Sequence, residues 1–386
     1  DVIYYIISMD IYEDFEDMNL KESLLRGIYS YGYEKPSSIQ QQAIVPITNK
    51  KDIIAQAQSG TGKTATFTVG MLQRLDEKDT NSQVIIIAHT RELAYQIKDV
   101  ITNLSTYMNI SINISVGGID VQKNIRELNN RPKIVIGTPG RLLDMIERGY
   151  LKLDKLKMLI LDEADELLSD IFVHQIQNIF RYLDKGVQVC VFSATMNETF
   201  FNITNNFMTD PIKILVKNEE LTLDGIKQYY VDVSKNDYKF DTLCDLYSTF
   251  SMSQSIIYCN SKRVVELLFD KLDKLNYSVS YIHGGMNQAD RDKRIQEFRN
   301  STTRVLISTD LLARGIDIQQ ISIVINYDIP KEKENYIHRI GRSGRYGRKG
   351  VALNLITTYD MEDLKVIERY YNTEIVPLPN IDALQV

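Results

Sequence analysis

The chain has 386 residues, of which 44% are hydrophobic and 25% are charged. This composition is typical of a globular protein, and the length exceeds what one core usually organises, so we expect two domains. The net charge of −6 excludes a protein that grips nucleic acid through an overall positive surface, and no apolar run approaches the roughly 18 residues of a membrane span.

Short runs rich in β-branched residues alternate with amphipathic stretches, which predicts an α/β fold of βαβ units with mainly parallel sheets. In the first half, the predicted strands cover residues 52–57, 83–89, 133–137, 157–162, 187–192 and 211–216. The predicted helices between them cover 63–77, 91–106, 139–148 and 165–182. The second half has predicted strands at 255–259, 304–308, 321–327 and 351–356. A polar stretch marks the hinge, so we place domains at 1–217 and 227–386 with a linker at 218–226.

Residues 57–64 read Ala-Gln-Ser-Gly-Thr-Gly-Lys-Thr after the first predicted strand, a pattern typical of a loop that cradles phosphates. Gly60 and Gly62 let backbone N–H groups turn toward phosphate oxygens. Lys63 supplies a charge for the β- and γ-phosphates, Thr64 supplies a hydroxyl for a metal ion, and the helix starting near Lys63 adds its dipole. Ala57 replaces the usual first glycine. The alternative is an ordinary strand–turn–helix rich in small residues.

Asp162 and Glu163 open the sequence Asp-Glu-Ala-Asp at the end of a buried strand, where open α/β sheets place their ligands. Asp162 would hold Mg²⁺, which keeps several waters and takes one or two carboxylates. Glu163 would polarise the attacking water. The alternative is that this acidic run only favours the start of the next helix. With the phosphate cradle, the pair predicts binding and hydrolysis of a nucleoside triphosphate.

A basic segment at 339–349 contains five cations and no acid. A solvated loop is the simplest interpretation of such a run. The spacing of Arg339, Arg342 and Arg345 points instead to guanidiniums on one side of a helical turn that converge on one anion.

The order and spacing of these motifs resemble the DEAD-box RNA helicases over nearly the whole chain. The matching segments are 32–40, 57–64, 89–94, 117–118, 138–141, 162–165, 193–195, 308–317 and 338–345, with Gln288 and Arg291. Connecting stretches at 219–228 and 240–247 resemble the initiation factor 4A branch, which includes a nuclear exon-junction relative.

The resemblance implies two RecA-like domains joined by a flexible linker, which bind ATP with Mg²⁺ and hold single-stranded or duplex RNA without strong sequence preference. Gln40 would read the adenine edge and Tyr33 would stack on its ring, within a motif spanning residues 15–40. The implied nucleotide contacts are Phe15, Tyr33, Gln40, Ala57, Gln58, Ser59, Gly60, Thr61, Gly62, Lys63, Thr64, Gly315, Asp317, Arg342 and Arg345. The implied catalytic residues are Lys63, Asp162, Glu163, Arg342 and Arg345, and the implied metal ligands are Thr64 and Asp162.

The resemblance also implies a path for RNA and a link to hydrolysis. The implied RNA contacts are Thr90, Arg91, Gly117, Gly118, Thr138, Arg141, Gln288, Arg291 and Thr309, and the implied coupling element is Ser193, Ala194 and Thr195. Arg342 and Arg345 would act as arginine fingers when the two domains meet around ATP. Glycine pairs and helix N-termini donate backbone N–H groups to phosphates, which reconciles an acidic protein with an RNA substrate.

Three positions depart from the family pattern. His89 stands where the family has proline, Gly285 stands where it commonly has aspartate, and residues 378–386 resemble the family's C-terminal end only loosely. The first two are expected to alter the grip on RNA, because one removes a φ restraint and the other an acid.

Two other functions share some of these motifs. A P-loop kinase or metabolic ATPase would explain 57–64 and 162–163 but leaves the spaced arginines unexplained. A non-enzymatic, ATP-locked RNA clamp that scaffolds other proteins shares every motif and stays open. The resemblance implies a monomer that binds a scaffold similar to initiation factor 4G.

The expected compartment is the cytoplasm, with the nucleus as the alternative. The cysteines Cys190, Cys244 and Cys259 are scattered, as in a reducing compartment. Residues 1–7 lack the basic flank and cleavage signature of a signal peptide, and Met9 is a candidate start.

Overall fold

A computed structural model describes residues 11–57, 61–196, 198–214, 226–249, 254–310, 321–341, 343 and 350–379. The chain divides into two compact units, Asp1–Val216 and Lys217–Val386. Each contains a seven-stranded sheet in which every described strand pair is parallel. The predicted α/β class is therefore confirmed. No helix in the described ranges is long and apolar enough to cross a membrane.

The first unit alternates strands and helices. Its strands are β1 (Ile53–Gln56), β2 (Val84–Ile87), β3 (Ile112–Ser115), β4 (Ile134–Gly137), β5 (Met158–Leu161), β6 (Gln188–Ser193) and β7 (Ile212–Ile214). Its helices are η1 (Glu16–Met18), α1 (Glu22–Ser30), α2 (Ser38–Thr48), α3 (Lys63–Arg74), α4 (Arg91–Leu104), α5 (Val121–Asn129), α6 (Pro139–Glu147), α7 (Ala164–Leu167), α8 (Val173–Arg181) and α9 (Glu198–Thr204).

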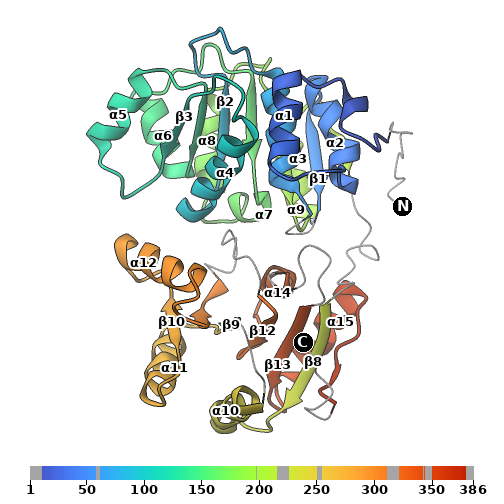
Figure 1. The fold of residues 1–386 in the computed structure, drawn as a ribbon, viewed down its shortest axis with the longest axis vertical. Helices are drawn as coiled ribbons and strands as arrows, with labels where there is room; N and C mark the ends of the chain where they lie inside the picture. The colour runs from blue at the N-terminus through green and yellow to red at the C-terminus, as the bar shows by residue number, and fades with distance from the viewer. Residues whose placement is uncertain are drawn as a thin grey trace. The chain divides into compact units, whose positions relative to one another are not determined.

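Helices cover both faces of the first sheet (Figure 1). Alternate strand residues point to opposite faces, so Ile53 and Ala55 pack in one apolar cluster and Ile54 in another. The first cluster takes side chains from α1 to α4, and the second takes them from α5 to α9. Burial on both faces explains why the central strands are continuous runs of isoleucine, valine and leucine.

The strand order of the first sheet, β3-β4-β2-β5-β6-β1-β7, decides which loops become neighbours. The ends of β3, β4 and β2 lie side by side, next to those of β5, β6 and β1. Because the strands are parallel, all their carboxyl ends meet at one edge, where α/β folds place their ligands.

The second unit repeats this architecture. Its strands are β8 (Ile226–Asp232), β9 (Ser255–Tyr258), β10 (Val279–Ile282), β11 (Val305–Ser308), β12 (Ile323–Asn326), β13 (Gly350–Ile356) and β14 (Val376–Pro377). Its described helices are η3 (Asn236–Tyr238), α10 (Lys239–Thr249), α11 (Lys262–Lys274), α12 (Gln288–Arg299), α14 (Lys333–Ile340) and α15 (Met361–Tyr371). The order β10-β11-β9-β12-β13-β8-β14 matches the first sheet strand for strand, which no short repeat in the sequence indicates.

The helix predicted over 165–182 is wrong, because the structure has two helices, α7 and α8, in that range. The hydroxyl of Ser169 donates to the carbonyl of Glu166 (2.6 Å) just after α7 ends. Serine often competes with the helical backbone in this way. The Ser169 carbonyl then accepts from the N–H of Val173 (2.9 Å), where α8 begins.

Strands β3, β8, β10 and the two-residue β14 were not predicted. In β3, isoleucine alternates with polar residues, and Asn113 and Ser115 are nevertheless buried. The prediction relied on continuous apolar runs and so missed such strands. β8 begins at Ile226, which the prediction assigned to the linker.

Candidate active site and nucleic-acid interface

Gly62 and Lys63 lie at the start of α3, where the described part of the phosphate cradle, Ala57 and residues 61–64, meets the helix. Gly62 is the N-cap of α3 with φ +98°, and a methyl group added there would lie 2.8 Å from Nε2 of Gln40, so glycine is required. The Lys63 side chain is buried, yet its Nζ has no hydrogen-bond partner among the described residues. A buried ammonium without a partner is costly, so this cradle fits a bound anion such as a phosphate.

The structure links the cradle to the segment predicted to read adenine. The Ser37 hydroxyl donates to the Thr61 carbonyl (2.8 Å), and the Ser37 N–H donates to Oε1 of Gln40 (2.8 Å). This capping box of α2 holds the buried Gln40 amide beside Gly62.

The two predicted aromatic contacts differ in exposure. Phe15 is fully buried in the core, edge-on to Tyr29, whereas Tyr33 is only partly buried. Tyr33 therefore has surface to offer a base, whereas Phe15 lies in the core and has no exposed surface to contact a nucleotide in this structure. Ala57 is buried in the same cluster, which shows that a methyl group fits where the motif usually has glycine. Gln58, Ser59 and Gly60 lie outside the described residues.

Asp162 and Glu163 follow β5 and are both buried. Burial raises the pKa of Asp162 to about 7, against the opposing effect of the Lys63 charge. A cation at this carboxylate would offset the cost of ionising it. The Thr64 hydroxyl lies 3.5 Å from Oδ2 of Asp162, so the two predicted metal ligands come together and fit a Mg²⁺ ion.

Glu163 has an unusual backbone for a residue with a side chain. Its φ of +50° lies in the left-handed region, and it forms the N-cap of α7. Such a conformation persists only where its surroundings enforce it, and it is frequent at functional sites. Here the turn lets the Asp162 Oδ1 accept from the N–H of Glu163 (3.0 Å).

The predicted coupling element contacts Asp165, the last residue of the Asp-Glu-Ala-Asp motif. The Thr195 hydroxyl donates to Oδ2 of Asp165 (2.7 Å), and the Asp165 N–H donates to Oγ of Ser193 (3.3 Å). Nε2 of Gln56, at the end of β1, donates to the carbonyl of Ala194 (3.3 Å). Gln56 and Asp165 were not among the predicted site residues, although Gln56 is a polar residue at the end of an apolar strand and Asp165 closes the Asp-Glu-Ala-Asp motif, which were usable signals.

The residues predicted to contact RNA in the first unit gather at the ends of β2, β3 and β4. Arg91 lies against the glycine pair 117–118, since a methyl group on Gly118 would sit 2.1 Å from its Nη1. Thr90 caps α4 by accepting from the N–H of Leu93 (3.2 Å), and Thr138 is the N-cap of α6.

Arg141 is held in place by two neutral groups. Its guanidinium donates to Oδ1 of Asn124 (3.2 Å) and to the carbonyl of Ile119 (3.0 Å). Both described partners lack charge, so the positive charge stays available for a phosphate. Asn124 was not predicted, and its buried amide also donates to Ser115 Oγ (3.0 Å).

In the second unit, the predicted RNA contacts lie at the start of one helix and at the end of one strand. Gln288 and Arg291 are in the first turn of α12, and Thr309 follows β11. The nucleotide contacts predicted at Gly315, Asp317, Arg342 and Arg345 lie outside the described residues and stay predictions. The side chain of Gln288 is also not described, so its RNA contact stays a prediction.

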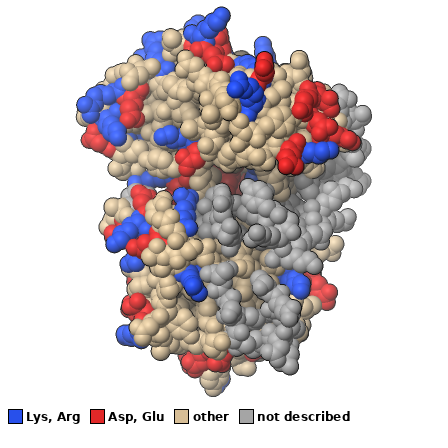
Figure 2. Space-filling model, in the orientation of Figure 1, with Lys and Arg blue, Asp and Glu red and all other residues tan. Residues whose placement is uncertain are grey.

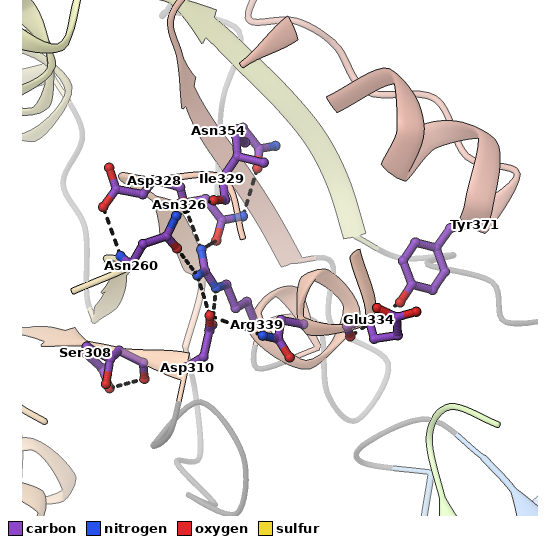
Figure 3. Close-up of polar contacts among 12 residues, drawn as sticks. Asn260, Ser308, Asp310, Asn326, Asp328, Ile329, Glu334, Arg339, Asn354 and Tyr371 are labelled. Carbon is purple, nitrogen blue, oxygen red and sulfur yellow. Dashed lines mark hydrogen bonds and ion pairs between the residues drawn. The ribbon is translucent and has the colours of Figure 1, made fainter. Parts of the chain in front are cut away.

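The structure corrects the role suggested for Arg339. Its side chain is fully buried and binds both oxygens of Asp310, Oδ1 of Asn260 (2.8 Å) and the carbonyl of Asp328 (2.6 Å). Figure 3 shows the guanidinium enclosed by these groups and by Asn326. α14 ends at Ile340, one residue after Arg339. Arg339 therefore holds β9, β11 and β12 together and does not converge on an anion with Arg342 and Arg345.

Replacing Arg339 with alanine should destabilise the second unit by at least about 3 kcal/mol, because a half-buried Asp310 and several polar groups lose their partner. Hydrogen exchange of the full chain would show lost protection in β9, β11 and β12, with the first unit as internal reference. Arg263→Ala, on the exposed face of α11, should change stability by less than about 0.5 kcal/mol. Unchanged protection in the Arg339 variant would contradict this role.

Two family models match the chain. The model of the DEAD/DEAH box helicases matches residues 37–203, and that of the helicase conserved C-terminal domain matches 238–347. The chain belongs to the DEAD-box helicase family. Both RecA-like domains of the predicted fold are thereby confirmed, and this helicase carries the predicted motif residues in each of them.

Similar proteins place this helicase near initiation factor 4A. The ATP-dependent RNA helicase eIF4A of Debaryomyces hansenii is 55% identical over 371 residues, 96% of this chain and 94% of that protein. Eukaryotic initiation factor 4A of Caenorhabditis elegans is 54% identical, covering 96% of this chain and 92% of that protein. The ATP-dependent RNA helicase FAL1 of Gibberella zeae is also 54% identical, with the same coverage.

Solved structures agree with the DEAD-box family. Dbp5 of Saccharomyces cerevisiae, bound to RNA and ADP BeF3, has a TM-score of 0.90 and 34% identity over 96% of each chain. A DEAD box protein from Methanococcus jannaschii has a TM-score of 0.58 and 36% identity, covering 96% of this chain and 100% of that one.

Proposed function

We propose that this chain is an ATP-dependent RNA helicase of the initiation factor 4A type, which hydrolyses ATP with Mg²⁺ and locally unwinds RNA in translation initiation. One observation carries the proposal. A single sheet edge presents the phosphate cradle after β1, the carboxylates after β5 and the coupling residues at the end of β6, beside the RNA-facing loops at β2, β3 and β4. Nucleotide chemistry and RNA contact thus share one rigid scaffold.

For hydrolysis, different residues of the first unit bind the phosphates, hold the metal ion and orient the attacking water. Lys63 and the N-terminus of α3 bind the phosphates. Asp162 and Thr64 hold Mg²⁺, which neutralises phosphate charge when bound. Glu163 orients the attacking water, and the contacts of Asp165 with Ser193 and Thr195 connect this carboxylate loop to β6.

RNA is held through its backbone at a few points. Arg91, Arg141 and the N-terminus of α6 supply positive charge and N–H groups for phosphates. On the face shown in Figure 2, basic and acidic side chains are interspersed among the described residues, and the whole chain carries a net charge of −6. This distribution favours a few local phosphate contacts and argues against a broad basic binding surface. Contacts to the backbone alone would make RNA recognition independent of base sequence.

The test of this function is ATP hydrolysis with and without single-stranded RNA. The rate of ATP hydrolysis should be low without RNA and should rise strongly when RNA is added, because the RNA-facing and catalytic loops lie on one sheet edge. DNA of the same sequence should stimulate far less, since it lacks the ribose 2′-hydroxyl. Equal stimulation by DNA would remove RNA selectivity, and no stimulation by either would favour a metabolic ATPase.

GTP should be a poor substrate. The Gln40 amide is oriented by the Ser37 N–H, so it can pair with N6 and N7 of adenine but meets a carbonyl oxygen at position 6 of guanine. Loss of one such hydrogen bond is worth about 1.4 kcal/mol, so kcat/KM for GTP should be at least about tenfold lower than for ATP. Similar kcat/KM values for the two nucleotides would remove Gln40 from this role.

We further propose that the protein acts as a cytoplasmic monomer with a scaffold partner similar to initiation factor 4G. Its likeness to initiation factor 4A proteins over 96% of the chain supports this assignment. The molecular mass from sedimentation of the purified protein tests the monomeric state. Co-purification of the scaffold from cytoplasmic extract tests the partner.

A further inference from the structure

His89 contacts the carboxylate that we assign to water orientation. Its Nδ1 lies 3.4 Å from Oε2 of Glu163, and the two side chains are only 4% and 8% exposed. Neither ATP binding nor RNA binding, as described above, uses the His89 side chain.

Sheet register brings these two residues together. β2 pairs with β5 in parallel, with Ile87 opposite Leu161, and the Asp162 N–H extends the ladder by donating to the Ile87 carbonyl (3.1 Å). His89 and Glu163 each lie two residues beyond the paired strand ends. The contact is therefore built into the sheet and does not depend on a distant loop.

The β2–β5 boundary also separates the two functional regions of the sheet edge. On the β2 side, Thr90 directly follows His89 and caps α4, whose first residue, Arg91, lies against Gly117 and Gly118. On the β5 side, Glu163 follows Asp162. His89 is thus attached by its backbone to the RNA-facing loop and by its side chain to the catalytic carboxylate.

We propose that His89 is a positioning residue that orients Glu163 and transmits RNA contact at Thr90 and Arg91 to ATP hydrolysis. The imidazole packs against Oε2 at 3.4 Å, and a proton on Nδ1 would donate to this oxygen and restrict the rotamer of the buried carboxylate. An apolar side chain at this position would have no donor, so the contact depends on the histidine that this chain carries. The inference rests on the proposed RNA-stimulated hydrolysis.

The test compares two variants of the full chain with wild type, measuring kcat and KM for ATP with and without saturating single-stranded RNA. His89→Leu keeps an apolar side chain in the buried site but removes the donor. It should lower the RNA-stimulated kcat by at least about tenfold, since displacement of a catalytic group by 1 Å can cost about 100-fold. KM for ATP and the affinity for RNA should stay within about twofold of wild type.

His89→Asn is the decisive companion variant, because its Nδ2 replaces the imidazole Nδ1 donor. It should recover most of the RNA-stimulated kcat. His174→Leu, on the exposed side of α8, is the matched control and should match wild type. A merely structural role for His89 would lower kcat equally in both substitutions or would weaken ATP binding as well.

The outcomes separate the two proposals. If RNA stimulates wild type but His89→Leu retains the wild-type kcat, or if His89→Asn falls as far as His89→Leu, the positioning role is wrong and the proposed function stands. If RNA does not stimulate wild type, the proposed function fails, and the role of His89 fails with it.

Discussion

Glu163→Gln is expected to abolish ATP turnover while ATP and RNA binding survive. The substitution keeps the size of the side chain but removes the carboxylate that orients the attacking water, and Asp162 and Thr64 still hold Mg²⁺. Loss of such a group costs about 10²–10⁴ in rate. Because binding persists without hydrolysis, the variant should accumulate a long-lived complex with ATP and RNA. Steady-state hydrolysis and ATP-dependent RNA retention measure the two effects separately.

The control for this variant is Glu147→Gln, at the exposed end of α6, which should hydrolyse ATP at the wild-type rate. Failure of Glu163→Gln to bind RNA in the presence of ATP would contradict the division of roles between Asp162 and Glu163. If the variant still unwinds duplexes and supports cellular function, hydrolysis is dispensable, and the protein acts as an ATP-locked RNA clamp.

Lys63→Ala should weaken ATP binding itself. The Lys63 ammonium is the buried charge that faces the phosphates, and a hydrogen bond to a charged group is worth about 1.5–3 kcal/mol. ATP affinity should therefore fall by about 10- to 100-fold. Equilibrium titration with a fluorescent ATP analogue measures this change.

For the same variant we expect no loss of stability, which is unusual for the removal of a buried side chain. Nζ of Lys63 is buried without a hydrogen-bond partner in the described part of the chain, so its removal should not destabilise the nucleotide-free protein. The free energy of unfolding should be unchanged or higher than that of wild type, whereas the exposed Lys78→Ala should alter neither stability nor ATP affinity. A Lys63→Ala protein that is less stable without ATP but binds ATP normally would show that Lys63 is structural.

The sequence by itself determined the features that depend on residues near one another in the chain. Gly62, Lys63 and Thr64 form a cradle because one turn and one helix start place them together, and Asp162 and Glu163 follow a strand that its apolar run predicts. The α/β class follows for the same reason, since the hydrophobic periodicity that predicts each helix or strand is set by residues close together in the chain. Residue motifs in a fixed order were enough to identify the family.

Only the tertiary structure decided which of these local features meet. The order β3-β4-β2-β5-β6-β1-β7 is not the chain order, so the contacts of Asp165 with Thr195 and of His89 with Glu163 depend on strand pairing between distant segments. Arg339 belongs to a basic run in the sequence, yet burial among Asp310, Asn260 and Asn326 makes it structural. Periodicity and composition do not report such pairing, because its energy comes from residues far apart in the chain.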